Sequence, residues 1–199
     1  TRAELFSEFS RLAYEDALTG LANRRAFEER LGRSFDRFLA GESRLTLLLC
    51  DVDRLKAIND ASGHAAGDEL LCSVAESLVA AAADHPGAFV ARLAGDEFCI
   101  LLEGRPSSRK RRGTHDAEGI ATAAQRILAK ATEGASLSCG VAAAGPGADT
   151  PSRLLSAADT AQYMAKRRGG NRVCTAAQGT DVIGPEAPPV VVTTPAARI

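Results

Sequence analysis

Apolar residues recur along this chain at two spacings, one typical of strands and one typical of helices. Five short apolar runs predict strands at 45–50, 89–92, 98–102, 137–142 and 172–174. Between them, apolar residues at helical spacing predict helices over 23–40, 69–83, 116–130 and 151–167. Strands that alternate with helices in this way predict an α/β fold, with helices packed on a mixed sheet.

The two ends of the chain differ from this central part. Residues 1–15 carry five apolar positions at helical spacing, which are Leu5, Phe6, Phe9, Leu12 and Ala13. We interpret them as the end of a linker helix from a sensory or regulatory domain upstream. From Thr175 onward the chain has no periodicity, so residues 176–199 are expected to be a disordered tail. The predicted folded domain therefore covers residues 16–175.

Two acidic clusters lie beside predicted strands. Asp51-Val52-Asp53 ends the apolar run at 45–50, and Asp96 and Glu97 stand between the Ala94-Gly95 turn and the strand at 98–102. If the two strands are neighbours, the carboxylates converge. Mg²⁺ is commonly held by one or two carboxylates plus substrate phosphates, so the pair of clusters favours metal-assisted phosphoryl transfer on a nucleotide. Taken alone, the second cluster fits a solvated acidic turn equally well.

The segment between the clusters has the residues of a nucleotide site. Backbone N–H groups of Arg54, Leu55 and Lys56, at the start of a short predicted helix, can hold an anion. The amide of Asn59 and the carboxylate of Asp68 can match the donors and acceptor of a guanine edge. Taken singly, Asn59 also fits a turn and Asp68 also fits a helix start.

The composition argues against nucleic-acid binding and against a membrane-spanning segment. With 199 residues and a net charge of −1, the chain can bury one core and has no basic excess that would favour nucleic acid. Its basic loop 105–114 lacks aromatic residues, so we interpret it as a solvated loop. The longest apolar runs are too short for a membrane span, so we expect no direct membrane contact and a cytoplasmic location. The parent protein can still be anchored in a membrane by another segment. The five unclustered cysteines predict buried free thiols.

Four motifs, in this order, match the pattern of a known family. They are 16–25 (DALTGLANRR), 51–60 (DVDRLKAIND) with Gly63-His64 and Gly67-Asp68, 94–98 (AGDEF), and 157–166 (AADTAQYMAK) with Asn171. With this combination the chain resembles the GGDEF domain of the diguanylate cyclase family over about residues 16–175, with Ala94 at the first position of the signature. The resemblance implies a ferredoxin-like, palm-type sheet.

The resemblance also implies roles for individual residues. Asp51 and Asp96 would be the carboxylate ligands of Mg²⁺ or Mn²⁺, assisted by the carbonyl of Val52, and Glu97 would be a further ligand or proton acceptor. Asn59 and Asp68 would recognise guanine. The triphosphate would be bound by Leu55, Lys56 and Lys166. The implied reaction joins two GTP into cyclic di-GMP and releases pyrophosphate, and it needs a homodimer partner because each protomer contributes one GTP.

Three departures from the family pattern bear on activity. Ala94 would cost about 1–2 kcal/mol if its position required a positive φ. Gly170 stands where the family usually has Arg, which removes a phosphate contact unless Arg167 or Arg168 replaces it. The Arg-x-x-Asp product-inhibition motif is replaced by residues 85–88 (HPGA), so feedback inhibition is expected to be absent.

The sequence is compatible with four functions. We favour an active diguanylate cyclase over a degenerate GGDEF domain that binds GTP as a regulatory sensor. A catalytically silent dimerisation module is the weaker reading, because it would not need the metal and guanine positions together. A cyclase that uses ATP is disfavoured, because the Asp68 carboxylate would meet an acceptor at adenine N1.

Overall fold

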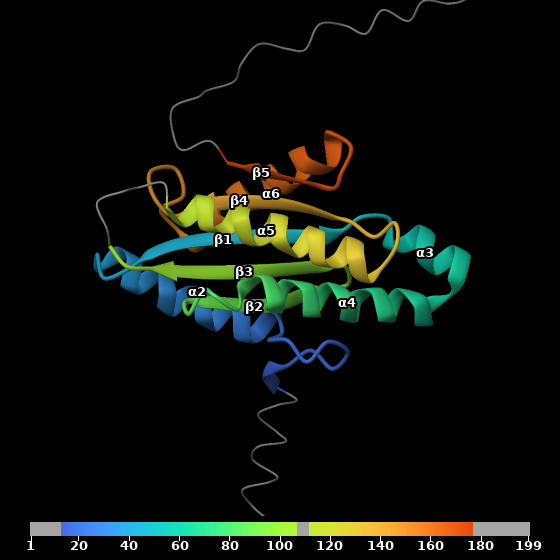
Figure 1. Ribbon diagram of the computed structural model, residues 1–199. Coiled ribbons are helices and arrows are strands. Elements are labelled where there is room, and N and C mark those ends of the chain that lie inside the picture. The colour runs from blue at the N-terminus through green and yellow to red at the C-terminus, as the bar shows by residue number, and fades with distance from the viewer. Residues whose placement is uncertain (1–12, 107–111, 177–199) are drawn as a thin grey trace, which may run out of the picture.

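The computed structural model of the chain describes residues 13–106 and 112–176, and in this part a five-stranded sheet forms the centre (Figure 1). The strands are β1 (Arg44–Val52), β2 (Ala88–Ala94), β3 (Glu97–Gly104), β4 (Leu137–Ala143) and β5 (Arg172–Thr175). Their order is β2-β3-β1-β4-β5, with a parallel β4–β5 pair and antiparallel pairs elsewhere. The predicted mixed sheet is therefore confirmed, and each strand is somewhat longer than its apolar run.

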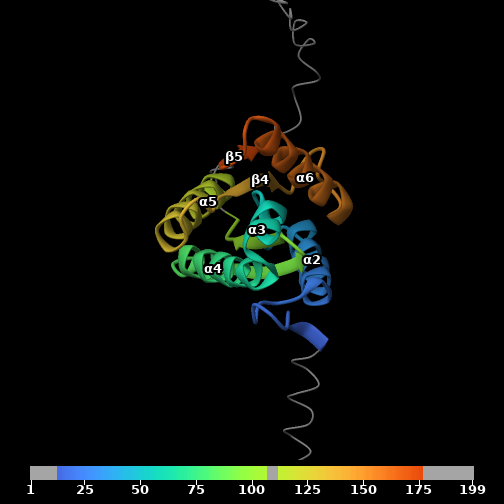
Figure 2. The same ribbon diagram turned by 90° about the vertical axis from the view of Figure 1, so that its right-hand side faces the viewer.

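Helices cover both faces of the sheet (Figure 2). The helices α2 (Arg24–Leu39) and α6 (Pro151–Arg167) pack on one face, and α4 (His64–Ala82) and α5 (Arg112–Ala131) on the other. The short helix α3 (Leu55–Ser62) lies beyond the end of β1. Asn23 caps α2 by accepting the Ala26 N–H at 3.1 Å, and Pro151 begins α6, as the sequence predicts.

Alternation along the central strand divides the core into two clusters. Leu45, Leu47 and Leu49 pack with α2 and α6, whereas Leu48 and Val52 pack with α4 and α5. Because β1 is buried on both faces, it reads in the sequence as a continuous apolar run. Asp51 continues the first of these two rows, so its side chain lies on the face covered by α2 and α6.

Two predicted helix boundaries were wrong. The helix expected at 69–83 begins at His64, and the helix expected at 116–130 begins at Arg112. Gly63, with φ of +83°, separates α3 from α4, and the residues that follow it are mostly exposed. Because residues 64–68 include no large apolar side chain, apolar spacing does not reveal where α4 begins.

Several expectations fall partly outside the described residues. Most of the expected linker helix at 1–15, the tail after residue 176 and residues 107–111 of the basic loop lie there. All five cysteines are free thiols, as predicted; Cys50, Cys99 and Cys139 are buried, while Cys72 and Cys174 are only partly so. Among the helices that the structure describes, none is long and apolar enough to cross a bilayer.

Candidate nucleotide and metal site

An open cavity of ≈ 790 Å³ lies at the end of the sheet where β1 leads into α3. Its lining includes seven of the residues predicted from the sequence, namely Asp51, Val52, Arg54, Leu55, Lys56, Asp96 and Lys166. They come from β1, the start of α3, the turn between β2 and β3, and the last turn of α6. The structure thus brings together residues that are more than one hundred positions apart in the sequence.

Asp51 lies at the centre of this arrangement. It pairs with Glu97 on β3 and with Ser138 on β4, so the three side chains form a row across one face of the sheet. The Lys166 ammonium lies 2.6 Å from Asp51 Oδ2. Burial raises the pKa of the Asp51 carboxyl above its usual range, the Lys166 hydrogen bond opposes this, and the nearby Asp96 raises it further.

Asp96 reaches the cavity from the turn between β2 and β3. Its carbonyl accepts the Val52 N–H at 3.1 Å, which ties the turn to the end of β1. Gly95 has the left-handed conformation in this turn, with φ of +44°. Outside glycine, positive φ occurs in the described residues only at Arg54 and Asn171, so the backbone strain considered for Ala94 is absent.

Glu97 stands beside the main cavity. Although it lies directly across from Asp51, its carboxylate is 4.0 Å from the Arg24 guanidinium on α2. It lines a separate, smaller cavity that also includes Phe27 and Gln162. Glu97 therefore lies next to Asp51 in the sheet, while its carboxylate lies toward Arg24 on α2.

The start of α3 provides the expected anion-binding backbone. Arg54, the residue before the helix, has a left-handed φ of +61°, and no side chain caps the first turn. Leu55 and Lys56 line the cavity immediately after it. Backbone N–H groups at a helix start carry partial positive charge, so this turn suits a phosphate group.

Asn59 and Asp68 lie together but outside the lining of the main cavity. The Oδ1 atom of Asn59 is buried and has no hydrogen-bond partner in the structure. It packs so closely on Gly67 that a Cβ there would lie 1.9 Å from it. Asp68 follows Gly67 and is exposed, so both predicted guanine-binding residues occur where α3 meets α4.

Asp53 has a separate role that its place in the sequence does not reveal. The Asp53 carboxylate accepts the hydroxyls of Ser136 and Ser138, at 2.7 and 2.6 Å, and the backbone N–H of Asn171 at 2.9 Å. Two serines spaced for one face of a strand were the available signal. Their relation to Asp53 needs the β1–β4 pairing, which the sequence does not reveal.

The residues around the cavity fit a divalent cation. Asp51 and Asp96 offer carboxylates and Val52 a backbone carbonyl, which are hard oxygen donors. The Lys166 ammonium already places a positive charge against Asp51. Among the described residues there is no group of three or more His, Cys, Asp and Glu side chains arranged for a metal. Two carboxylates supplemented by substrate phosphates are nevertheless a usual set for Mg²⁺.

Comparison with known proteins identifies the family. The family model described as diguanylate cyclase, GGDEF domain, matches residues 13–172. The chain therefore belongs to the GGDEF family, as its motifs indicate. Diguanylate cyclase TpbB of Pseudomonas aeruginosa is 37% identical to it over 190 residues, covering 89% of this chain and 43% of that protein. Diguanylate cyclase DgcM of Escherichia coli is 36% identical over 172 residues, covering 86% of this chain and 40% of DgcM.

Solved structures agree with the fold. The coiled coil and GGDEF domain of DgcB from Caulobacter crescentus, in complex with c-di-GMP, matches with a TM-score of 0.71 and 29% identity. The match covers 87% of this chain and 91% of that one. The chain thus has the GGDEF fold, while it spans only about two fifths of the length of TpbB and DgcM.

Proposed function

We propose that this domain is a diguanylate cyclase that condenses two GTP into cyclic di-GMP with Mg²⁺ or Mn²⁺. The observation that carries the proposal is the single cavity in which Asp51, Asp96, Lys166 and the start of α3 converge. Carboxylates for a cation and cationic groups for phosphates then lie within one site. The family membership supports the same reaction.

In the proposed reaction each residue group has one task. Lys56, Lys166 and the first N–H groups of α3 hold the triphosphate, while Asp51, Asp96 and the Val52 carbonyl hold the cation. The cation, when bound, lowers the pKa of the attacking hydroxyl and offsets charge on the phosphates. Glu97 is a further ligand or proton acceptor beside this set. Asn59 and Asp68 bind the guanine edge.

The reaction requires two protomers. The 3′-hydroxyl of each GTP attacks the α-phosphate of the other, so two P–O bonds form, two break, and two pyrophosphates leave. We propose that two domains bind face to face as a homodimer, brought together by an upstream sensory or regulatory domain. Residues 85–88 lack the product-inhibition motif, so we propose that the product does not inhibit through this position.

Substitution of the metal residues tests the proposal. Asp51→Asn and Asp96→Asn should each remove most turnover of GTP, because each removes a charged oxygen ligand. Asp36→Asn makes the same chemical change on an exposed part of α2 and should leave turnover unchanged. Full turnover in Asp51→Asn or Asp96→Asn would refute the metal assignment.

A second candidate is a sensor that binds GTP without turning it over. Gly170 favours it, because this residue lines the cavity and offers no side chain to a phosphate. One experiment distinguishes the cyclase from the sensor. The unmodified domain is incubated at high protein concentration with GTP and Mg²⁺, and bound GTP and released pyrophosphate are measured. Bound GTP without pyrophosphate release would support the sensor.

A further inference from the structure

Asp53 joins three segments of the chain at the edge of the cavity. Its own N–H donates to the Ser136 carbonyl at 3.0 Å, which extends the β1–β4 pairing past the end of β1. Its Oδ1 accepts the Ser138 hydroxyl, and its Oδ2 accepts the Ser136 hydroxyl and the Asn171 N–H. Both carboxylate oxygens therefore have partners within the protein, in contrast to a carboxylate that is available to a metal.

The turn from α6 to β5 approaches Asp53 closely. Gly169, Gly170 and Asn171 all have positive φ, of +107°, +72° and +47°. A Cβ at Gly170 would lie only 3.1 Å from both oxygens of Asp53. The absence of a side chain at Gly170 thus lets the turn dock directly on the carboxylate.

The same turn follows directly on Lys166 and is hydrogen-bonded to the end of α6. The N–H of Gly169 donates to the Lys166 carbonyl at 3.0 Å, and the N–H of Gly170 to the Ala165 carbonyl at 3.1 Å. Lys166 therefore belongs to the last turn of α6, whose end is attached to Asp53 through Asn171. A displacement of this turn would move the ammonium away from Asp51, which it now contacts at 2.6 Å.

We propose that Asp53 is a positioning residue that docks the α6–β5 turn on β4 and so keeps the Lys166 ammonium at Asp51 and at the triphosphate. The expected effect on nucleotide binding rests on the proposed function, in which Lys166 binds phosphate. The docking itself does not depend on that function. The two parts therefore need separate measurements.

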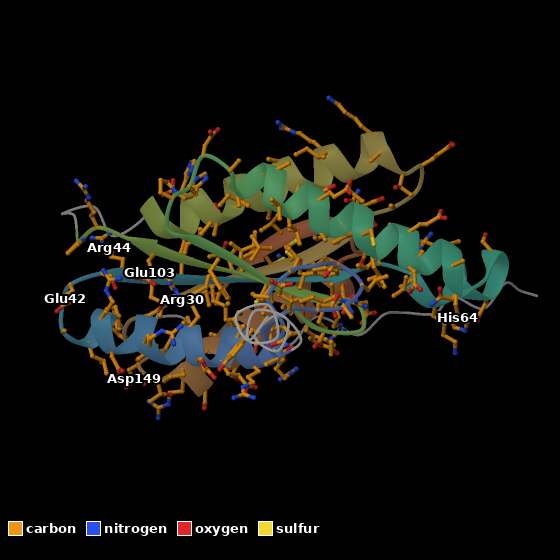
Figure 3. The ribbon with its side chains drawn as sticks, turned by 90° about the horizontal axis from the view of Figure 1, so that it is seen from below. Arg30, Glu42, Arg44, His64, Glu103 and Asp149 are labelled. Carbon is orange, nitrogen blue, oxygen red and sulfur yellow. The ribbon has the colours of Figure 1, made fainter. Side chains whose placement is uncertain are left out.

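The first experiment requires no nucleotide. In Asp53→Ala, hydrogen exchange at the Asn171 amide should accelerate by about tenfold or more, because its acceptor is gone. Acetylation of Lys166 by an amine-reactive reagent, followed by mass spectrometry, should accelerate too. Asp149→Ala, at a residue that precedes α6 and is labelled in Figure 3, is the matched control and should change neither rate. Unchanged rates in Asp53→Ala would overturn the proposal.

The second experiment is a double-mutant cycle with a non-hydrolysable GTP analogue. Asp53→Asn should raise the Kd about tenfold, which corresponds to about 1.4 kcal/mol. In a Lys166→Met background the same change should have almost no effect, since Asp53 acts through Lys166. Equal, multiplicative losses in both backgrounds would mean that Asp53 acts independently and would overturn the proposal.

Two further variants and the readouts without nucleotide keep the proposal testable if either experiment fails. If Asp53→Ala does not fold, Ser136→Ala and Ser138→Ala each remove one donor to the carboxylate and should show smaller shifts in the same direction. If the unmodified domain binds no GTP analogue, the proposed function fails, and the exchange and acetylation rates alone decide whether Asp53 docks the turn.

Discussion

The ion pair between Asp16 and Arg92 offers a direct test of how the start of the domain is held. Asp16 Oδ1 accepts the Thr19 N–H at 2.9 Å, the Thr19 hydroxyl at 2.7 Å and an Arg92 N–H at 2.9 Å. Arg92 also donates twice to the Gly95 carbonyl, at 2.7 and 3.0 Å. Asp16→Asn removes the charge from this network while keeping the shape of the side chain.

The expected loss follows from burial and charge. The Arg92 side chain is 11% exposed and that of Asp16 25%, so solvent screens the pair only in part. Hydrogen bonds to charged groups contribute about 1.5–3 kcal/mol, and the partial exposure favours the lower end. We therefore expect Asp16→Asn to lower the free energy of unfolding by about 1.5–2 kcal/mol at pH 7.

The pH dependence has a definite sign. Burial alone would raise the pKa of Asp16, but hydrogen bonds from Thr19 and Arg92 lower it below its ordinary value overall. A carboxyl with a lowered folded-state pKa stabilises the fold above its unfolded-state pKa, and this stabilisation is lost as the pH falls through the folded-state pKa. The difference between the native chain and Asp16→Asn should therefore be full at pH 6–7 and shrink below about pH 4.

Urea unfolding of the two proteins from pH 7 to pH 3 provides the measurement. Asp36→Asn, an exposed change on α2, serves as the control and should follow the native chain at every pH. Equal stability of Asp16→Asn and the native chain at pH 7, or a difference that stays constant down to pH 3, would mean that the charge of Asp16 does not stabilise the fold.

Three further predictions concern recognition, the core and assembly. Asp68→Ala should reduce the preference for GTP over ATP in a competition titration, because a charge-assisted bond of about 1.5–3 kcal/mol is lost, and an unchanged preference would exclude Asp68 from guanine recognition. Phe98→Ala should cost about 3–5 kcal/mol in urea unfolding, since Phe98 is 0% exposed, and a loss below about 1 kcal/mol would contradict its place in the core. A parallel coiled coil fused ahead of Leu5 should raise product per protomer at low protein concentration, whereas specific activity that the fusion does not change would mean that assembly is not limiting.

The two central strands β1 and β3 could be predicted because their apolar runs are short and bounded by charged residues. Leu45 to Cys50 reads as a buried strand, and the structure confirms it, although β1 continues through Asp51 and ends at Val52. The convergence of Asp51 and Asp96 could be predicted only on the condition that their strands are neighbours. The β1–β3 pairing meets that condition.

Other features depend on long-range pairing or local backbone geometry. Asp53 reads in the sequence as one more acidic residue, because its serine partners lie 83 and 85 positions away. Whether Ala94 needs positive φ depends on the turn, which requires that conformation only at Gly95. The direction of Glu97 toward Arg24 likewise depends on where α2 packs.

If this domain makes cyclic di-GMP, the coiled-coil fusion should form it from GTP and Mg²⁺, and separation of the nucleotides after incubation detects it. We expect cyclic di-GMP and pyrophosphate in a ratio of one to two, and most of the product to be lost when the fusion carries Asp96→Asn. GTP that is bound by the fusion but recovered unchanged would mean that the domain is not a diguanylate cyclase.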